Sequence, residues 1–262
     1  MIETKTYENI IHERDGNVAY VTMNRPKKRN ALSLDHMLEL KECFEAIGED
    51  RETSVVILQG EGPAFCAGHD LSEMIGRDPE TYRHIFDVCC ELMQTIQGIP
   101  QPVIAQVHSI ATAAGCQLAA TCDLVVAAEE ARFATPGVKI GLFCSTPMVA
   151  LSRAVGQKKS MEMLLTGEFI SAEEARAEGL VNRVVPADEL STATRTLADR
   201  IADASPLVVG MGKAGFYRQL EMPTEEAYAY TREVMSNNAS LADAQEGMSA
   251  FLEKRKPEWK GR

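Results

Sequence analysis

The sequence predicts an α/β fold with a helical C-terminal part, and two patterns carry this prediction. Through about residue 148, short apolar runs typical of strands recur between longer segments with helical spacing. Beyond that point the strand patterns fade and helical patterns dominate to the C-terminus. Because 45% of the 262 residues are hydrophobic, the chain also has enough apolar side chains for a full core.

The first predicted strand covers residues 18–23, where apolar side chains alternate with others, and it ends before Pro26, which cannot continue a sheet. A helix is predicted over residues 33–49, with Ser33 as its N-cap. The apolar run at residues 55–58 is typical of a buried strand. The order strand, helix, strand is that of an α/β protein.

The next elements follow the same alternation. Residues 82–97 have helical spacing, and residues 102–107 return to a strand pattern. A helix of small residues is predicted over 113–122, a strand over 124–127, and a short extended piece that ends at Pro136.

The C-terminal part is predicted to be helical, with N-caps at Ser171, Ser205 and Thr224. The sequence contains no internal repeat and no linker rich in glycine and serine. A separable second domain is therefore not expected.

The formal net charge of −11 argues against a nucleic-acid or membrane partner, because both attractions depend on an excess of basic side chains. The longest weakly apolar stretch, residues 110–128, is interrupted by Gln117 and Asp123, so no membrane span is expected. An anionic ligand would need a local basic cluster.

The seven cysteines are odd in number and none forms a CxxC pair, which predicts reduced thiols in a reducing compartment. The histidines likewise show no ligand spacing, and we expect no metal.

The N-terminal residues do not resemble a signal or transit peptide. This favours the cytoplasm, or the mitochondrial matrix for a processed eukaryotic chain.

Two turns rich in small residues are the places where chemistry is expected. Across residues 64–71 a strand gives way to a glycine turn, where backbone N–H groups can point outward. Across residues 111–117 a helix begins with side chains so small that a ligand can approach its free N–H groups. Together the turns can form an oxyanion hole, although small residues at a helix start also serve close packing.

These two turns resemble those of the enoyl-CoA hydratase/isomerase, or crotonase, family. The resemblance extends in the family's order over nearly the whole chain, through residues 24–32, 65–71, 113–119, 122–124, 165–167, 172–185 and 246–255. It implies a crotonase-type ββα spiral core over residues 1–195 and a helical region over residues 196–262. That region would close the site and build a homotrimer or homohexamer. The implied ligand is an acyl thioester of coenzyme A, with no further cofactor.

The resemblance also implies roles for individual residues. The family's two oxyanion-hole N–H groups fall on His69 and Ala114, where only the backbone is required. The family's CoA contacts fall on Lys27, Lys28, Arg29, Ala67, His69, Asp70 and Leu71 and, from a neighbouring subunit, on Phe251 and Lys254. Without the resemblance, a solvated loop explains Lys27 and Lys28 equally well.

The chain departs from the family at the two positions that hold catalytic glutamates, which are Gln117 and Gly137 here. Family hydratases use that pair to position and activate one water molecule. A glutamine cannot usefully accept a proton, and a glycine has no side chain at all. The resemblance therefore implies the thioester site without its usual acid–base pair.

Other groups near the acyl end are Cys144 and Ser145, which by position line the pocket. Cys144 as a nucleophile would need a base and a lowered pKa. His69 can act as an acid or base near neutral pH, or can pack beside its turn.

Three functions remain. The first is an enolate-stabilising acyl-CoA enzyme, nominally an enoyl-CoA hydratase or isomerase. The second is a non-catalytic acyl-CoA binding protein. The third is an acyl-CoA hydrolase or decarboxylase with a different acid or base.

Overall fold

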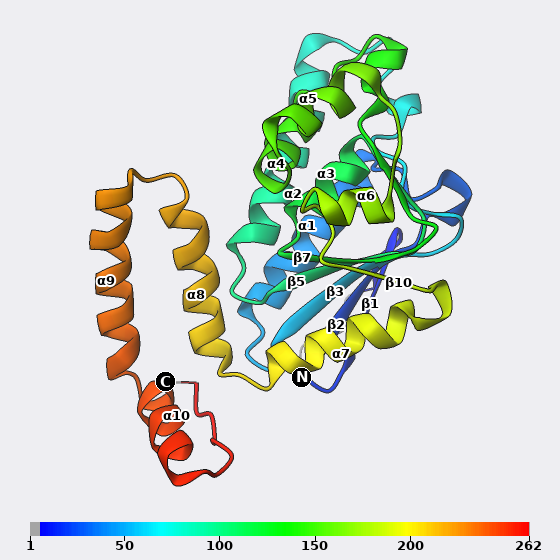
Figure 1. The fold of residues 1–262 in the computed structure, drawn as a ribbon. Helices are drawn as coiled ribbons and strands as arrows, with labels where there is room; N and C mark the ends of the chain where they lie inside the picture. The colour runs from blue at the N-terminus through cyan, green and yellow to red at the C-terminus, as the bar shows by residue number, and fades with distance from the viewer. Residues whose placement is uncertain (1–5, 262) are drawn as a thin grey trace.

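The computed structural model describes residues 6–261, and its centre is a six-stranded sheet (Figure 1). In sheet order the strands are β1 (Ile10–Asp15), β2 (Val18–Met23), β3 (Val55–Gly60), β5 (Val103–Val107), β7 (Leu124–Ala128) and β10 (Arg183–Val185). β1 and β2 form an antiparallel hairpin, whereas every other neighbouring pair is parallel. The predicted strands at 18–23, 55–58, 102–107 and 124–127 are confirmed.

A second sheet contains four short strands, in the order β4 (Ala64–Cys66), β6 (Ile110–Thr112), β8 (Arg132–Ala134) and β9 (Ile170–Ser171). β4, β6 and β8 each follow directly on a strand of the large sheet. Each turn of the chain thus adds one strand to each sheet. The result is a spiral of paired strands and helices, which confirms the predicted α/β core.

The helices α1 (Leu34–Glu49), α2 (Pro79–Gly98) and α3 (Ala114–Thr121) cover one face of the large sheet. The opposite face is covered by α7 (Leu190–Ala202), which packs over the buried side chains of Val18, Ile57, Ile104 and Val126 (Figure 1). The central parallel strands are therefore buried on both faces, which explains why they appear in the sequence as continuous apolar runs.

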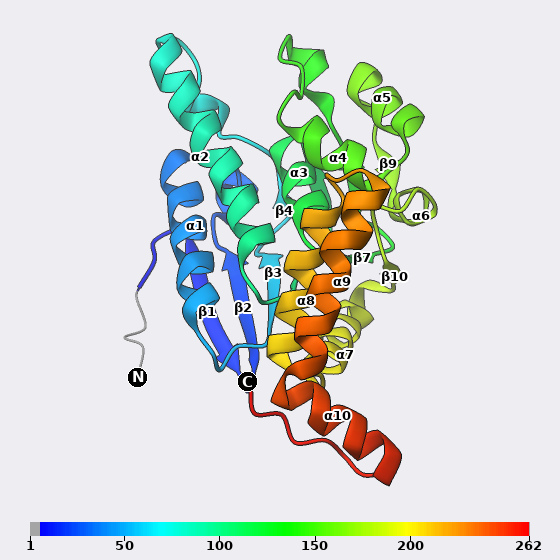
Figure 2. The same ribbon diagram turned by 90° about the vertical axis from the view of Figure 1, so that its left-hand side faces the viewer.

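The remaining helices form two groups. α4 (Pro147–Ala154), α5 (Gln157–Thr166) and α6 (Ala172–Ala177) continue the core around α3. α8 (Pro206–Gln219), α9 (Thr224–Ser240) and α10 (Ala242–Glu253) form an arm beside it (Figures 1 and 2).

The arm is attached to the core through a buried lysine on α8. The Lys213 ammonium donates to the carbonyl oxygens of Ile96 (2.8 Å) and Gln101 (2.9 Å) and lies 2.8 Å from the Asp123 carboxylate. Asp123 also accepts the hydroxyl of Tyr217 at 2.8 Å. We call Lys213, Asp123 and Tyr217 the arm pin.

Several sequence expectations need correction. Strands do occur after residue 148, but β9 and β10 have only two and three residues, too few to show a periodic pattern. The N-caps at Ser171 and Ser205 are confirmed, whereas the prediction for Thr224 is wrong by one residue. Pro223 is the N-cap residue, and Thr224 is already helical.

Two other expectations concern where the core ends and whether a helix crosses a membrane. The predicted division at residue 195 falls inside α7, whereas the arm begins at α8. No helix of residues 6–261 is both long and apolar enough to cross a membrane. The expectation of no targeting segment rests partly on residues 1–5, which lie outside the described residues.

Candidate active site

A cavity of about 500 Å³ lies where the end of β4, the start of α3 and the loop before α4 meet. Seven of the predicted site residues line it: Ala67, His69, Leu71, Ala114, Gly137, Cys144 and Ser145. Its wall is mostly apolar, and Lys139 is the one lysine or arginine among the described residues that line it. None of the described residues that line the cavity is acidic. The cavity thus suits an apolar group held by backbone contacts.

Two lining residues offer backbone N–H groups without an acceptor among the described residues. Leu32 donates its N–H to Gly68 (2.8 Å) and accepts the N–H of Asp70 (3.0 Å), so the intervening N–H of His69 faces away from Leu32. Ala114 is the first residue of α3, where a helix leaves its N–H groups unpaired. These are the two donors that the family resemblance assigns to an oxyanion hole.

The two donor turns pack closely against each other because each has a glycine at the contact. A Cβ atom added to Gly68, whose φ is +91°, would lie 2.9 Å from the Cβ of Ala113 and 3.4 Å from the nitrogen of Ala114. A Cβ atom on Gly115 would lie 2.1 Å from the carbonyl oxygen of Cys66. Both positions therefore require glycine, because any side chain would separate the turns.

The backbone at Ala113 makes the sharp transition from β6 into α3. Ala113 has φ 51° and ψ −119°, a conformation that costs a non-glycine residue about 1–3 kcal/mol. Its N–H donates to Ala134 at 2.9 Å, and its carbonyl accepts the N–H of Gln117 at 3.0 Å. This residue thus starts the helix abruptly, with the Ala114 N–H at the cavity wall.

The predicted basic loop lies against the turn that carries His69. Lys27, Lys28 and Arg29 are exposed, at and just after the 3-10 helix η1 (Pro26–Lys28). The carbonyl of Arg29 accepts the N–H of Ala67 at 3.0 Å. The structure thus brings together the two segments to which the resemblance assigns CoA contacts, and it supplies the local basic cluster that net charge does not.

Asp70 secures this turn. Its carboxylate accepts the N–H and hydroxyl of Ser72 and lies 3.1 Å from the Arg25 guanidinium. Burial by itself would raise the pKa of Asp70, but the hydrogen bonds from Ser72 and Arg25 outweigh it and hold the pKa below its usual value. The ionised carboxylate of Asp70 therefore stabilises the turn.

The imidazole of His69 packs edge-on against Phe86 of α2, with ring centroids 5.5 Å apart. Burial lowers its pKa from 6.5 to about 4, an effect that the nearby Leu32 backbone partly opposes. Neither ring nitrogen has a hydrogen-bond partner among the described residues. His69 is therefore neutral at physiological pH.

The two glutamate positions differ in their surroundings. Gln117 is buried under α2, where its side-chain oxygen lies 3.9 Å from the Cys89 sulfur, and it is not among the described lining residues. Gly137 does line the cavity, in the 3-10 helix η3 (Pro136–Ile140). The structure thus brings Gly137 to the cavity but leaves Gln117 behind its wall.

Gly137 also has no room for a side chain. Its added Cβ would lie 2.0 Å from the carbonyl oxygen of Leu142 and 2.8 Å from the sulfur of Cys144. The hydrogen bond from the N–H of Leu142 to the Gly137 carbonyl, at 2.9 Å, closes this tight turn. Restoring a glutamate here would therefore require the loop to move.

The thiol of Cys144 is buried, and this burial raises its pKa although the Gly137 backbone partly opposes the shift. Behind it, burial raises the pKa of Cys116 to about 12. Ser145 is exposed at the rim and shows a hydrogen bond to Phe143. Both predicted pocket residues thus line the cavity, with the thiol protonated at neutral pH.

Phe251 and Lys254 lie on and just after α10, at the far end of the arm from this cavity (Figure 1). Phe251 is 82% exposed, and neither residue lines the cavity of its own chain. Their assignment to a neighbour's site remains a prediction.

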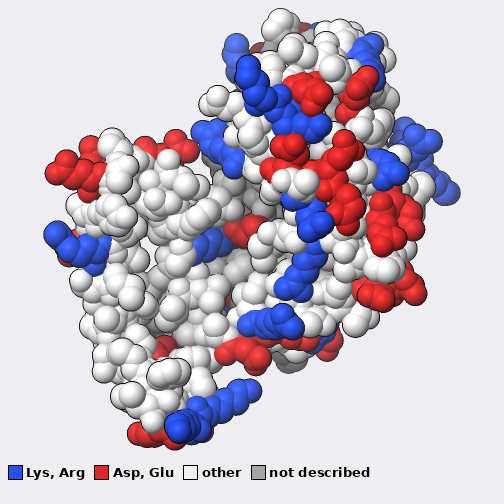
Figure 3. All heavy atoms as spheres, in the orientation of Figure 1, with Lys and Arg blue, Asp and Glu red and all other residues white. Residues whose placement is uncertain are grey.

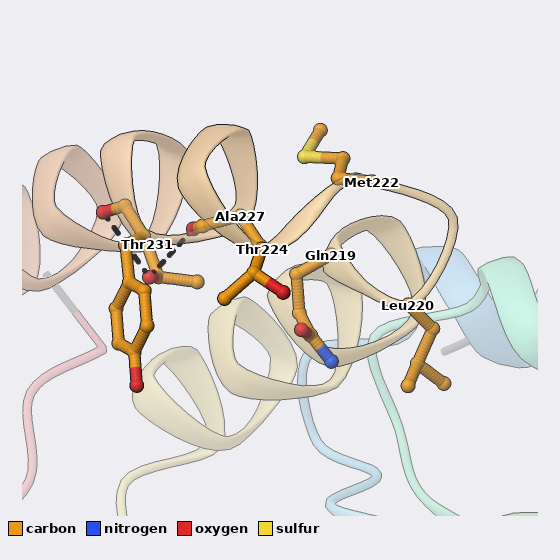
Figure 4. A pocket seen from close by; sticks show the side chains of 7 residues that line it. Gln219, Leu220, Met222, Thr224, Ala227 and Thr231 are labelled. Carbon is orange, nitrogen blue, oxygen red and sulfur yellow. Dashed lines mark hydrogen bonds between the residues drawn. The ribbon is translucent and has the colours of Figure 1, made fainter.

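A second hollow, of about 330 Å³, lies at the turn between α8 and α9 (Figure 4). The hydroxyl of Thr231 is used by the helix itself, since it donates to the carbonyl of Ala227 at 2.8 Å. The side chains that Figure 4 labels carry no charge at neutral pH. This hollow lacks the means for acid–base chemistry.

Sequence reasoning missed several residues of the main cavity, above all Phe86, Lys139 and Phe143. Phe86 lies on α2, which the helical spacing of residues 82–97 predicted, but that spacing does not show which side chain of the helix reaches the cavity. Lys139 and Phe143 belong to a loop that folds back over the cavity, and no periodic pattern in the sequence predicts this path.

Comparison with known proteins shows which family this chain resembles. A sequence model described as enoyl-CoA hydratase/isomerase matches residues 13–262. The human protein named enoyl-CoA hydratase domain-containing protein 3, mitochondrial, is 48% identical over 240 residues, 91% of this chain and 79% of the human protein. The rat protein of the same name is 45% identical over 248 residues, 94% of this chain and 82% of its own length.

Solved structures show the same backbone. An enoyl-CoA hydratase of Mycobacterium smegmatis superposes with a TM-score of 0.94 at 50% identity, covering 96% of this chain and 99% of that chain. The human domain-containing protein 3 gives a TM-score of 0.94 at 45% identity, covering 96% and 100%. The predicted crotonase-type fold is confirmed, and the chain belongs to the enoyl-CoA hydratase/isomerase family.

Proposed function

We propose that this protein binds acyl-CoA thioesters and holds the thioester oxygen with the backbone N–H groups of His69 and Ala114. One observation carries the proposal: two unpaired donors, fixed by glycine packing, line a mostly apolar cavity. Such donors stabilise the negative charge that develops on the oxygen when a thioester becomes an enolate. The basic loop at Lys27, Lys28 and Arg29 supports a phosphate-bearing ligand, and no cofactor is required beyond the CoA of the substrate.

The reaction we favour is an enolate-type conversion of the lyase or isomerase kind, with ordinary two-glutamate hydration weak or absent. Gln117 has no acidic group, and Gly137 has no side chain. General acid–base catalysis typically contributes about 10²–10⁴-fold, so its loss leaves a binding site with little hydration activity. A non-catalytic acyl-CoA binding protein is the alternative.

We propose that the active assembly is a homotrimer or homohexamer, with Phe251 and Lys254 completing a neighbour's CoA site. The arm presents a face largely free of charge (Figure 3). Phe216, Leu220, Tyr228 and Met235 of the arm are all more than half exposed. A second copy of the chain is a suitable partner for such a surface.

A reducing compartment, either the cytoplasm or the mitochondrial matrix, is proposed for the protein. All seven cysteines are free. Unpaired thiols in this number are typical of a reducing environment. The human and rat relatives carry the word mitochondrial in their names.

The donor pair can be tested with a ¹³C-labelled thioester carbonyl in butyryl-CoA. Binding should lower the carbonyl stretching frequency, because two N–H groups polarise the C=O bond. Gly68→Ala should remove this shift and weaken binding about tenfold, the equivalent of one lost hydrogen bond of about 1.4 kcal/mol. Its added methyl would lie 2.9 Å from the Cβ of Ala113.

Gly16→Ala is the matched control. Gly16 also has positive φ, at +62°, but its added Cβ meets no atom within 4 Å. Both variants therefore carry the left-handed backbone cost of about 1 kcal/mol, and only Gly68→Ala separates the turns. An unshifted carbonyl band in the bound wild-type protein would exclude the donor pair.

Turnover is tested by incubating the protein with enoyl-, malonyl- and short acyl-CoA esters and identifying products by mass spectrometry. Isomerised enoyl products, or hydrated products that form only slowly, support the favoured reaction, whereas efficient hydration would show that residues other than Gln117 and Gly137 carry the chemistry. Free CoA or loss of CO₂ would instead indicate a hydrolase or decarboxylase, for which the neutral His69 is the available base. Saturable binding without any product would establish the binding protein.

A further inference from the structure

Cys144 occupies a particular place beside the predicted thioester site. Its sulfur lies 2.8 Å from the point where a Cβ atom of residue 137 would stand. The thiol thus fills the space from which the family's second glutamate would project. Of the seven cysteines, all of which are described, Cys144 alone lines the cavity.

The cavity around this thiol has further features that indicate a ligand. The N–H groups of His69 and Ala114 lack acceptors among the described residues. Both ring nitrogens of His69 are also buried without a partner in the described part of the chain. The two backbone N–H groups are suited to a polar atom of a bound molecule, and their residues belong to the same cavity wall as Cys144.

A thiol can take the part of the water that a hydratase adds to its substrate. Water has a pKa of about 15.7 and needs a positioned carboxylate to become a nucleophile, whereas a free thiol has a pKa of about 8.5. Burial raises the pKa of Cys144 above that of a free thiol, but a thiol remains far more acidic than water. A base weaker than the missing glutamate pair can therefore assist its addition to an electron-poor double bond, and the neutral His69 is the base available in the cavity wall. Because the thiol and the bound ester share one cavity, the addition also becomes an intramolecular step with a high effective concentration of the thiol.

We infer that Cys144 captures α,β-unsaturated acyl-CoA esters covalently, by addition of its sulfur to the β-carbon. This inference rests on the proposed binding of acyl-CoA thioesters. A bond forms between the sulfur and the β-carbon while the carbon–carbon π bond breaks. Its electron pair moves toward the thioester oxygen, which the N–H groups of His69 and Ala114 hold. The proton that leaves the thiol is returned to the α-carbon, so no group departs and no oxidant is needed.

The test is intact-protein mass spectrometry after incubation with crotonyl-CoA. The protein should gain the whole mass of crotonyl-CoA, and peptide mapping should place the addition on Cys144. Saturated butyryl-CoA should bind without forming an adduct, because it has no double bond to accept the sulfur. Attack on the carbonyl would instead transfer only the acyl group and release free CoA, and that result would overturn the inference.

Two variants complete the design. Cys144→Ser replaces sulfur by a far weaker oxygen nucleophile and should abolish the mass gain. Its folding is checked by thermal unfolding and by its binding of butyryl-CoA. Cys90→Ser changes the one cysteine that is not buried and that lies outside the cavity wall, and it should leave the adduct in place.

The outcomes separate this inference from the proposed function. Binding of butyryl-CoA with no adduct from crotonyl-CoA would overturn covalent capture and leave the binding function intact. An adduct that persists in Cys144→Ser would assign the reaction to another residue and likewise overturn it. Absence of butyryl-CoA binding would overturn the proposed function, and this inference with it.

Discussion

At the scale of single residues, Gly137 limits what repair of the active site can achieve. A side chain at this position collides with the backbone carbonyl of Leu142, which cannot rotate away as a side chain would. A paired change of Gln117 and Gly137 to glutamate therefore demands a new loop conformation in addition to two carboxylates. The shape of this loop therefore excludes a glutamate at position 137, so the residue and the loop conformation can change only together.

We predict that Gly137→Ala lowers the free energy of unfolding by about 1–3 kcal/mol, the usual cost of overpacking. Gly212→Ala is the control, since Gly212 is an exposed residue inside α8 with no atom within 4 Å of an added Cβ. That change should stabilise the helix by about 0.5–1 kcal/mol. Urea unfolding measures both, and equal stability of the two variants would contradict the steric argument.

Buried histidines should make the fold sensitive to mild acid. Burial lowers the pKa of His36 from 6.5 to about 4, and that of His69 by the same amount. Between these pH values the unfolded chain binds more protons than the folded chain. Stability is therefore complete above pH 6.5 and falls with decreasing pH by about 1.4 kcal/mol per pH unit for each histidine, until the folded pKa is reached.

Unfolding measured from pH 7 to pH 5 should show this loss. His36→Asn should remove about half of the slope that the two buried histidines produce. His84→Asn, which changes an exposed histidine, should leave the slope as it is. A stability that does not change over this interval would show that both imidazoles are charged in the folded protein.

At the scale of secondary-structure elements, the arm pin joins α8 to the core. Burial lowers the pKa of Lys213, while the nearby Asp123 carboxylate opposes the shift. Asp123 accepts the Val103 N–H at 2.7 Å in addition to the groups of the pin. The carboxylate therefore connects the start of β5, the end of α3 and the arm.

Removing one partner of a buried ion pair typically costs about 3–5 kcal/mol, because the remaining charge stays buried without compensation. Lys213→Met should lower the free energy of unfolding by this amount. The double variant Lys213→Met with Asp123→Asn should lose less, since no charge is left in the pin. Tyr217→Phe, which removes one hydrogen bond, should cost about 1 kcal/mol. Chemical denaturation of the three variants tests this order, and a double variant that loses as much stability as Lys213→Met, or more, would refute it.

The elements also show which features a sequence can predict. Strands β2, β3, β5 and β7 were predictable because burial on one or both faces leaves a pattern of apolar residues in the chain itself. β1 escaped because four of its six residues, His12 to Asp15, are polar or charged. In the second sheet, β4 and β8 were indicated by the strand before the glycine turn and by the extended piece that ends at Pro136. β6 and β9 escaped because two or three residues show no period, and their pairing is set by partners distant in the sequence.

The candidate site divides in the same way. The glycine turns at Gly68 and Gly115 were visible as small-residue segments, and the basic loop was visible as charge. The clash at Gly137 and the burial of Gln117 behind the wall were not, because both depend on where the loop of residues 137–147 returns in space. A backbone donor leaves no side-chain signal, so His69 and Ala114 were assignable through resemblance alone.

At the scale of the whole molecule, the site and the end of the arm are far apart within one chain (Figure 2). If neighbours complete one another's CoA sites, a change at the end of the arm should affect ligand binding without touching the cavity of its own chain. Phe251 and Leu252 are adjacent on α10 and almost equally exposed, at 82% and 80%. They form a natural pair for this test.

We predict that Phe251→Ala weakens binding of butyryl-CoA by about 10- to 150-fold, because burial of an aromatic side chain against a ligand contributes about 1.5–3 kcal/mol. Leu252→Ala should bind as the unmodified protein does. Calorimetry measures the affinities, and light scattering should report a trimer or hexamer throughout. A monomer that binds with full affinity would exclude shared sites.

The donor groups of this site belong to peptide bonds, and peptide bonds are present whatever residue the gene specifies. Replacing His69 or Ala114 by a small residue other than proline removes no donor, whereas Gly68 and Gly115 tolerate no side chain. In the proposed site, ligand class and reaction class are thus encoded at separate positions. A lineage can lose its acid–base pair by ordinary mutation and acquire a thiol in the same space, while it continues to hold the same type of ester. Homologous chains with a common inherited ligand are then expected to differ in what they do to it.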